Sequence, residues 1–229
     1  KAADKGKETV PNANYLWINL FATSLKEKGR AALVMANSAS DARHSEADIR
    51  QTLIENNLIY GMLTLPSNMF YTVTLPATLW FFDKDKQDDN ILFIDARNIF
   101  TQIDRAHREF SEEQIQNIAI ISKLHKGKRL EFVRLIHSYF EKGRVLLAEN
   151  KTQVEPVSEQ LLEVLDGEQG KLAVGDSVKQ WKALSELDTD FEHYQATVKG
   201  QFQDLKNVDK INQAQHKLQQ TYEPFFEAL

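Results

Sequence analysis

The most informative absence from this sequence of 229 residues is cysteine. Without cysteine the chain cannot form disulfides, thiolate zinc sites or a cysteine nucleophile. The absence also fits a reducing compartment, so we expect a cytoplasmic protein. No apolar run approaches the roughly 18 residues of a membrane-spanning helix, and we expect no membrane partner. No two histidines have the spacing of a metal site, so no metal is expected.

Positive charge is also scarce. The 28 lysine and arginine residues face 33 acidic residues, which leaves a net charge of −5. This balance disfavours a surface that binds nucleic acid all over, and only a local basic patch could serve. One basic run holds Lys123, His125, Lys126, Lys128 and Arg129. It could follow a DNA backbone, but a solvated turn between two helices explains it as well, and we favour the turn.

A starting methionine and a signal peptide are missing too. Residues 1–14 read KAADKGKETVPNAN, a polar segment with the composition of the middle of a loop. We therefore expect this chain to be part of a longer protein.

What is present is an alternation of helical segments and short apolar strands. We predict helices over residues 13–29 and 45–57, and strands over residues 31–36, 58–66, 74–82 and 91–97. This order indicates an α/β protein with a doubly wound sheet whose first half is missing. The last links are too short for crossover helices, so the last strands should run antiparallel to their predecessors.

Local features refine this prediction. Residues 13–29 are apolar almost all round, which predicts a helix packed on both sides. Residues 31–36 are continuously apolar, as in a central parallel strand buried on both faces. Ser45 with Asp48, and Ser111 with Gln114, have the spacing of capping boxes at helix starts.

The remainder of the chain has a helical character. Residues 111–127 and 129–143 are predicted helices, and residues 150–175 hold one proline and three glycines, which predicts a linker with one short helix. After Asp176 large apolar side chains recur every three or four residues. Two long amphipathic helices hinged near Asn207 are therefore expected.

The segments GRAALVMANSASDARHSEADIR and LPSNMFYTVTLPATLWFFD carry a specific resemblance. From about residue 12 to about residue 140 the chain resembles the modification (M) subunit of type I restriction–modification systems. That resemblance implies an adenine-specific DNA methyltransferase that uses S-adenosylmethionine. The implied partners are DNA, a specificity subunit and a restriction subunit.

The resemblance and the residue pattern together lead us to expect a domain plan. Residues 1–110 would be the carboxy-terminal half of a Rossmann-like class I methyltransferase sheet, with an antiparallel end hairpin. Residues 111–149 would be helices packed on it, residues 150–175 a linker, and residues 176–229 a helical tail that docks a subunit.

Two family motifs do not occur in these 229 residues. One is the glycine-containing cofactor loop after the first strand, and the other is the catalytic Asn-Pro-Pro-aromatic tetrapeptide. We therefore expect no catalytic residue in this chain, no tight binding of S-adenosylmethionine and no activity in isolation. The alternative is a non-catalytic scaffold whose helical tail binds a protein partner.

The segment between the predicted strands 58–66 and 74–82 carries two adjacent rings. The resemblance places Phe70 where related adenine methyltransferases stack an aromatic ring on the flipped base, with Tyr71 as the alternative. Ligands of open α/β sheets bind at the carboxyl ends of strands, which fits this position. The structural alternative is that Phe70 caps the core and Tyr71 lies on the surface.

Polar residues follow the predicted strand 31–36 and should point toward the same rim. Our candidates for DNA contact are Asn37, Ser38, Arg43, Arg50 and Asn68. An ordinary turn with capping residues explains the first four equally well.

Rings of the helical tail are our candidates for partner binding: Trp181, Phe191, Tyr194, Phe202, Tyr222 and Phe225. Two helices can hide only one face of each, so some rings should stay exposed. They would be covered by the specificity subunit or by a second copy of the chain. Burial of the rings within the tail itself is the competing outcome.

Overall fold

The computed structural model describes residues 2–4, 7–9 and 13–228, without the side chains of residues 2–4, 7–9, 182–186, 225, 226 and 228. The chain divides into two units, residues 1–122 and 123–229, and each is described by itself. The first unit opens with a small hairpin of β1 (Ala2–Asp4) and β2 (Lys7–Thr9), where the polar sequence had predicted a loop.

A four-stranded sheet forms the centre of the first unit. Its strands are β3 (Arg30–Ala36), β4 (Ile59–Thr64), β5 (Ala77–Asp83) and β6 (Leu92–Asp95), in the order β3-β5-β4-β6. β5 runs antiparallel to both of its neighbours, and β6 runs parallel to β4. All four strands were predicted, and each of the last two runs antiparallel to its predecessor in the chain, as expected.

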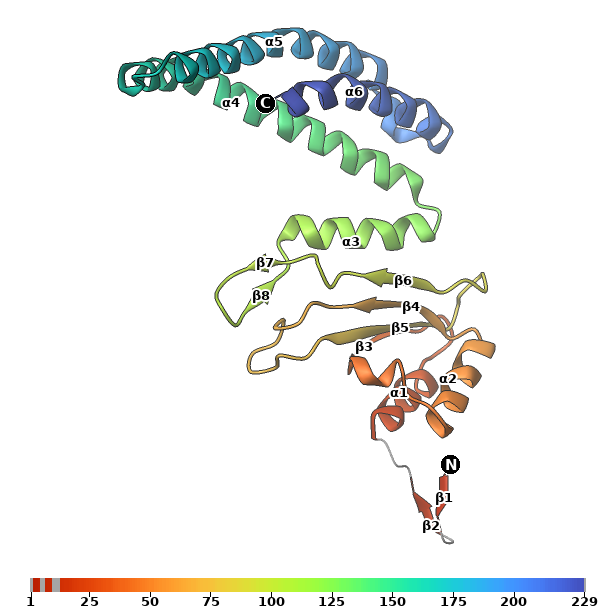
Figure 1. Ribbon diagram of the computed structural model, residues 1–229. Coiled ribbons are helices and arrows are strands. Elements are labelled where there is room, and N and C mark those ends of the chain that lie inside the picture. The colour runs from red at the N-terminus through yellow and green to blue at the C-terminus, as the bar shows by residue number, and fades with distance from the viewer. Residues whose placement is uncertain (1, 5–6, 10–12, 229) are drawn as a thin grey trace. The chain divides into compact units, whose positions relative to one another are not determined.

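Helices cover both faces of this sheet (Figure 1). α1 (Ala13–Thr23) and α2 (Ser45–Glu55) pack against the face that carries Trp80 and Phe82. On the opposite face Leu79 and Phe81 pack with residues of α3 (Glu112–His125), among them Ile118. The period-two alternation of a strand thus sends neighbouring side chains of β5 into two cores. The α/β fold class and the layered arrangement agree with the sequence prediction.

Two expectations about burial were wrong. β3 lies at the edge of the sheet among the described residues, and its side chains are alternately exposed and half-buried, apart from the buried Met35. α1 buries Tyr15 and Ile18 but leaves Leu16, Trp17 and Leu20 about half exposed. The reason is the same for both elements. Each contacts described neighbours on one side only, so an apolar composition does not lead to burial all round.

The two predicted capping boxes had different outcomes. At the start of α3 the Ser111 amide donates to Gln114 Oε1 at 2.9 Å, and the Gln114 amide donates to Ser111 Oγ at 3.2 Å. This is the reciprocal pattern of a capping box. At α2 the N-cap is His44, whose side chain accepts no capping bond, and Ser45 is already helical. The box predicted for Ser45 and Asp48 is therefore wrong.

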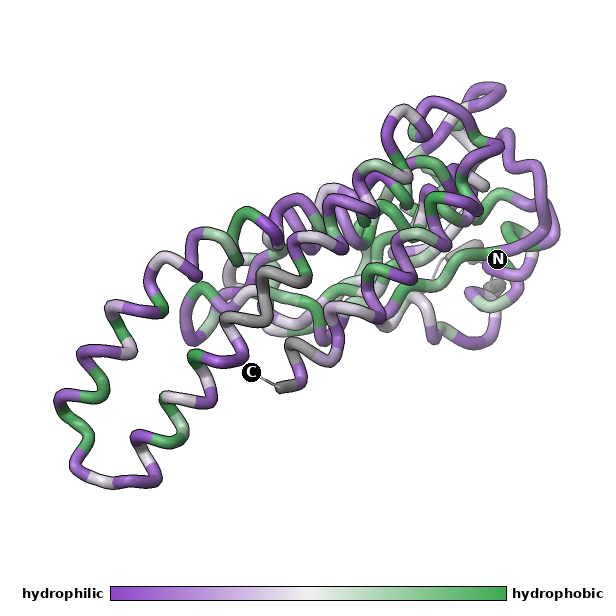
Figure 2. The backbone as a smooth tube through the Cα atoms, turned by 90° about the horizontal axis from the view of Figure 1, so that it is seen from above, coloured by the Kyte–Doolittle hydropathy of each residue, from purple (hydrophilic) through white to green (hydrophobic). Residues whose placement is uncertain are grey.

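The second unit is helical. It contains α4 (Arg129–Val164), α5 (Glu168–Val198) and α6 (Val208–Ala228), with two short 3-10 turns, η2 (Gln201–Gln203) and η3 (Leu205–Asn207), before α6. The turn between α5 and α6 confirms the hinge expected near Asn207. α4 and α5 continue side by side past the end of α6 (Figure 2). Among the described residues no helix is long and apolar enough to cross a membrane.

The linker predicted over residues 150–175 does not exist as such. α4 continues through Gly143 and Pro156, and only residues 165–167 separate it from α5. A glycine costs a helix about 1 kcal/mol and a proline about 3 kcal/mol, but helices in proteins draw most of their stability from packing. Here α4 and α5 pack on each other, and this contact outweighs the local signals.

Candidate functional site

Four chain segments meet at one edge of the sheet. The strand register pairs Ala36 with Ala77, and Thr64 with both Thr78 and Asp95. The carboxyl ends of β3, β4 and β6 therefore share this edge with the start of β5. In open α/β sheets this is where ligands bind. We call it the rim.

The loop between β4 and β5, residues 65–76, is the most apolar part of the rim. Met69 points inward and packs with the core that contains Leu63 and Ala96. Phe70 remains 40% exposed and Tyr71 remains 86% exposed. Large apolar side chains are costly to leave in water, so a loop that anchors one and exposes the next two is a candidate binding surface.

The backbone of this loop holds an uncommon shape. Asn68 has a φ of 61° and Thr72 a φ of 65°, one on each side of the two rings. Asn tolerates left-handed geometry, but for β-branched threonine it is a true outlier. The Val73 amide donates to the Phe70 carbonyl at 3.0 Å and closes a tight turn. Such strain concentrates at functional sites.

A hairpin that the sequence did not predict stands beside this loop. It consists of β7 (Thr101–Gln102) and β8 (Arg108–Glu109) and lies at the same end of the sheet as the loop (Figure 1). The Tyr71 and His107 rings meet edge-on, with centroids 6.3 Å apart. The sequence carries a turn signal in Asp104. In the structure its Oδ1 accepts a bond from the Ala106 amide at 2.7 Å. Strands of two residues are too short to show a periodic pattern.

An ion pair between Asp95, the last residue of β6, and Arg97 contributes charge to the rim. Arg97 donates through Nε and Nη2 to the Asp95 carboxylate, at 2.9 and 2.7 Å. These hydrogen bonds, with one from the Arg97 amide, lower the pKa of Asp95 to about 2. The carboxylate is thus ionised at neutral pH and paired with Arg97.

The predicted DNA-contact residues lie in different settings. Asn37 is half-buried, and its Oδ1 accepts a bond from Thr78 Oγ1 at 2.8 Å, which ties β3 to β5. Ser38 and Arg43 are exposed. Asn68 is half-buried, and its carbonyl accepts a bond from the Arg108 amide at 3.0 Å.

Arg50 has an internal position. Its Nη1 donates to Tyr15 Oη at 2.7 Å and to the Ala42 carbonyl at 3.0 Å. Tyr15 in turn donates to the Ala39 carbonyl at 2.6 Å, and burial raises the pKa of Tyr15. Arg50 therefore fixes the turn that follows β3, and of the two predicted arginines Arg43 is the one that is exposed.

Most predicted partner-binding rings are buried within the helical unit. Phe191, Tyr194 and Tyr222 are fully or nearly buried, and Trp181 and Phe202 pack half-buried against the same core. The Phe225 side chain lies outside the described residues. The expectation that some of these rings stay exposed is not met by the five whose side chains are described, because it counted two helices. α4 supplies a third, through Val133 and Phe140.

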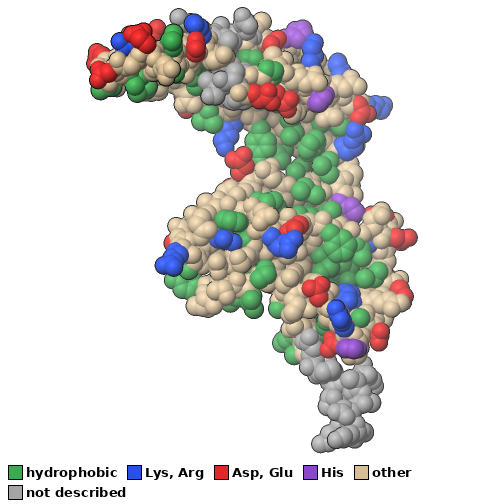
Figure 3. Space-filling model, in the orientation of Figure 1, with side chains coloured by type: hydrophobic (Ala, Val, Ile, Leu, Met, Phe, Trp, Pro, Cys, Tyr) green, Lys and Arg blue, Asp and Glu red, His purple; other side chains and the backbone are tan. Residues whose placement is uncertain are grey.

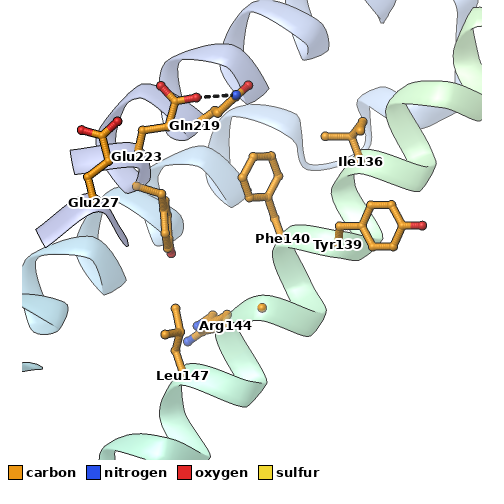
Figure 4. Close-up of a pocket in the computed structure, with 10 residues that line it drawn as sticks. Ile136, Tyr139, Phe140, Arg144, Leu147, Gln219, Glu223 and Glu227 are labelled. Atoms are coloured by element: carbon orange, nitrogen blue, oxygen red, sulfur yellow. Dashed lines mark hydrogen bonds between the residues drawn. The ribbon is translucent and has the colours of Figure 1, made fainter. Parts of the chain in front are cut away.

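Two other features of the helical unit are exposed to solvent. A groove of about 670 Å³ lies between α4 and α6, lined by Phe140, Arg144, Leu147 and Glu223 among others (Figure 4). Farther along α4, Val157, Leu161 and Val164 are 48%, 44% and 75% exposed. Their spacing of four and three residues puts them on one face. We call these three residues the α4 stripe.

The described residues do not fit a cofactor loop for S-adenosylmethionine. Such a loop needs a glycine just after the carboxyl end of a strand, so that the backbone can approach the ligand. In the described part of the first unit, Gly29 precedes β3 and Gly61 lies inside β4.

Comparison with known proteins gives a consistent family. Residues 3–137 match the family model described as N-6 DNA Methylase. The chain is 42% identical over 121 residues to the methylase subunit of the type I restriction enzyme MjaIX of Methanocaldococcus jannaschii. It is 36% identical over 110 residues to that of HindI of Haemophilus influenzae. These alignments cover 49% and 47% of this chain, but only 22% and 25% of the relatives.

A solved structure is also similar in sequence. It is the methyltransferase subunit of a type I restriction-modification system from Streptococcus thermophilus, 25% identical, with a TM-score of 0.47. The match covers 54% of this chain and 25% of that one. The chain spans about a quarter of the length of the relatives it matches. Because the family model covers more than half of its residues, the chain belongs to the N-6 DNA methylase family.

Proposed function

We propose that this chain is part of the methyltransferase subunit of a type I restriction–modification complex. The complete subunit transfers a methyl group from S-adenosylmethionine to the exocyclic amine of adenine in DNA. The observation that carries the proposal is the pair of exposed rings, Phe70 and Tyr71, at the rim of a sheet that belongs to the N-6 DNA methylase family.

The chemistry explains why a ring is needed there. The amine of a paired adenine is out of reach inside the duplex, so the enzyme turns the nucleotide out, at a cost of a few kcal/mol. A flat side chain that stacks on the base offsets part of this cost. Phe70 has the required properties, since it is partly exposed, sits on an anchored loop and lies at the ligand-binding edge.

Exchange of single rings in the full-length subunit, assayed on DNA, tests this role. Phe70→Ala should lower methylation roughly ten- to a hundredfold, because loss of one stacked ring removes about 1–3 kcal/mol. Tyr71→Phe is the matched control, because it keeps the neighbouring ring and removes only a hydroxyl. A folded Phe70→Ala protein that methylates at the wild-type rate would refute the assignment.

The isolated chain should not bind S-adenosylmethionine tightly, because its described residues offer no glycine loop for the cofactor. Calorimetric titration is the direct measurement, and micromolar affinity would contradict the expectation. The residues encoded before Lys1 distinguish the enzyme from the scaffold alternative. An Asn-Pro-Pro-aromatic tetrapeptide there supports the methyltransferase, and its absence supports the scaffold.

We propose that the helical unit docks the specificity subunit, through the α4 stripe and not through its rings. The stripe exposes aliphatic side chains on a helix that extends past α6. Seven acidic residues and two lysines surround it between residues 149 and 176. The acidic side chains gather around the turn between α4 and α5 (Figure 3). This surface fits a partner helix with one apolar face and basic flanks.

Co-purification of the full-length subunit with its specificity subunit tests this docking role. Leu161→Asp should weaken assembly because it puts a charge into the apolar contact. Thr152→Ala is the control, because this exposed and uncharged residue is on the same helix but outside the stripe. Undiminished assembly of the Leu161→Asp protein would leave α4 and α5 as a self-contained structural element.

A further inference from the structure

We infer that Arg108 is a positioning residue, which holds the loop of Phe70 and Tyr71 in the shape that receives a base. This inference rests on the proposed function and adds the β7–β8 hairpin to the site. The hairpin would act on the reaction through the loop, without touching the reacting atoms.

Arg108 joins the hairpin to the loop through two bonds. Its amide donates to the Asn68 carbonyl at 3.0 Å, and its Nη1 donates to Ser67 Oγ at 3.0 Å. Asn68 is the residue whose φ of 61° turns the chain toward the rings. This backbone bond constrains the direction in which Phe70 leaves the loop and remains in variants of Arg108. The bond from the guanidinium group to Ser67 Oγ is the one that such variants remove.

The guanidinium group is itself held on two other sides. Its Nε donates to Gln102 Oε1 at 3.0 Å, and its Cζ lies 4.0 Å from the centroid of the Phe100 ring. Arginine suits this position because its donors form a rigid planar fork that can also stack on a ring. Lysine would carry the same charge but only a single, flexible donor group.

The neighbouring residue supports the loop at a second point. The His107 ring meets the Tyr71 ring edge-on, and His107 Nε2 lies 3.3 Å from Glu109 Oε1. Tyr71 is otherwise 86% exposed. Adjacent residues of the hairpin thus contact both ends of the segment from Ser67 to Tyr71.

The test compares two arginines of the same hairpin in the full-length methyltransferase. Arg105 is exposed, lies in the turn of the hairpin and has no contact with the loop among those described above. Arg108→Ala should lower kcat for methylation roughly tenfold or more, since small misplacements of a reacting group can cost about a hundredfold. KM for DNA should change less than about twofold, because few phosphate contacts are lost. Arg105→Ala should keep kcat, and Arg108→Lys should recover only part of it.

A second readout reports the base itself. A 2-aminopurine placed at the target adenine fluoresces when it leaves the stack and is quenched when a ring stacks on it. Arg108→Ala should alter this signal, and Arg105→Ala should leave it unchanged. Hydrogen exchange of residues 67–73 in the same protein should quicken in Arg108→Ala alone.

The outcomes separate the two proposals. If the wild-type subunit does not methylate DNA, the proposed function is refuted. If it does, and Arg108→Ala matches Arg105→Ala in kcat and fluorescence, the positioning role is refuted. A rise in KM with unchanged kcat would also refute it, because Arg108 would then serve binding and not positioning.

Discussion

Two groups of aromatic rings in this chain, one in each unit, have opposite surroundings. In the helical unit Phe191 and Tyr194 are almost fully buried, and they recur with Leu187 and Val198 at helical spacing. In the sheet unit Phe70 and Tyr71 are adjacent in a loop, with no period, and both are exposed. Rings that follow the period of their element build the core, and rings that break it are available to a ligand.

The largest contrast concerns stability. Phe191→Ala should lower the free energy of unfolding by about 3–5 kcal/mol, because it opens a cavity in the core of three helices. Tyr71→Ala should cost less than about 1 kcal/mol, because its ring is exposed and meets, among the described rings, the edge of His107. Urea denaturation followed by circular dichroism measures both. A Tyr71 variant as unstable as the Phe191 variant would remove the distinction between core rings and ligand rings.

Replacement of a glycine by alanine should change the stability of the two units in opposite directions. A Cβ added to Gly61 would lie 2.9 Å from the Leu92 carbonyl oxygen of β6, the strand that pairs with β4. Gly61→Ala should therefore destabilise by about 1–3 kcal/mol. In α5 a Cβ on Gly175 would meet nothing within 4 Å, so Gly175→Ala should stabilise by about 0.5–1 kcal/mol. Stability changes of the same sign for the two variants, measured by thermal unfolding, would contradict this comparison.

The two serines at helix starts provide a smaller contrast within the first unit. Ser111→Ala removes the acceptor of the Gln114 amide and should cost about 1 kcal/mol. Ser45→Ala should cost less than about 0.5 kcal/mol, because Ser45 makes no capping bond. Equal losses of unfolding free energy in chemical denaturation would mean that the capping box at α3 adds nothing beyond what Ser45 contributes.

The smallest effect is electrostatic. Hydrogen bonds from Arg97 hold the pKa of Asp95 at about 2, below its ordinary value of 3.8. The pair therefore contributes stability above about pH 4, and this contribution is lost as pH falls toward 2. Arg97→Ala should return the pKa of Asp95 toward 3.8, as measured by NMR titration. In the helical unit Lys123 lowers the pKa of Glu131 in the same way, so Lys123→Ala should raise it.

Much of the fold could be predicted because local signals agreed with tertiary contacts. The strands of the sheet, the helix after Ser111 and the hinge near Asn207 follow from period, capping residues and turn residues. Phe70 and Tyr71 could be proposed as site residues because the resemblance to type I modification subunits places a stacking ring in this loop. Arg108 could not, because its role depends on contacts with residues about forty positions earlier in the chain.

The sequence by itself determined the family, the strand and helix order, and the absence of cysteine chemistry, because these depend on residue type and spacing. Only the tertiary structure decided which faces are buried. Periodicity shows that a face is apolar, but burial depends on what packs against it. Among the described residues β3 has one strand neighbour and α1 packs through one face only, and the tail rings gained an unexpected third helix. For the same reason, only the structure revealed the hairpin beside the exposed rings.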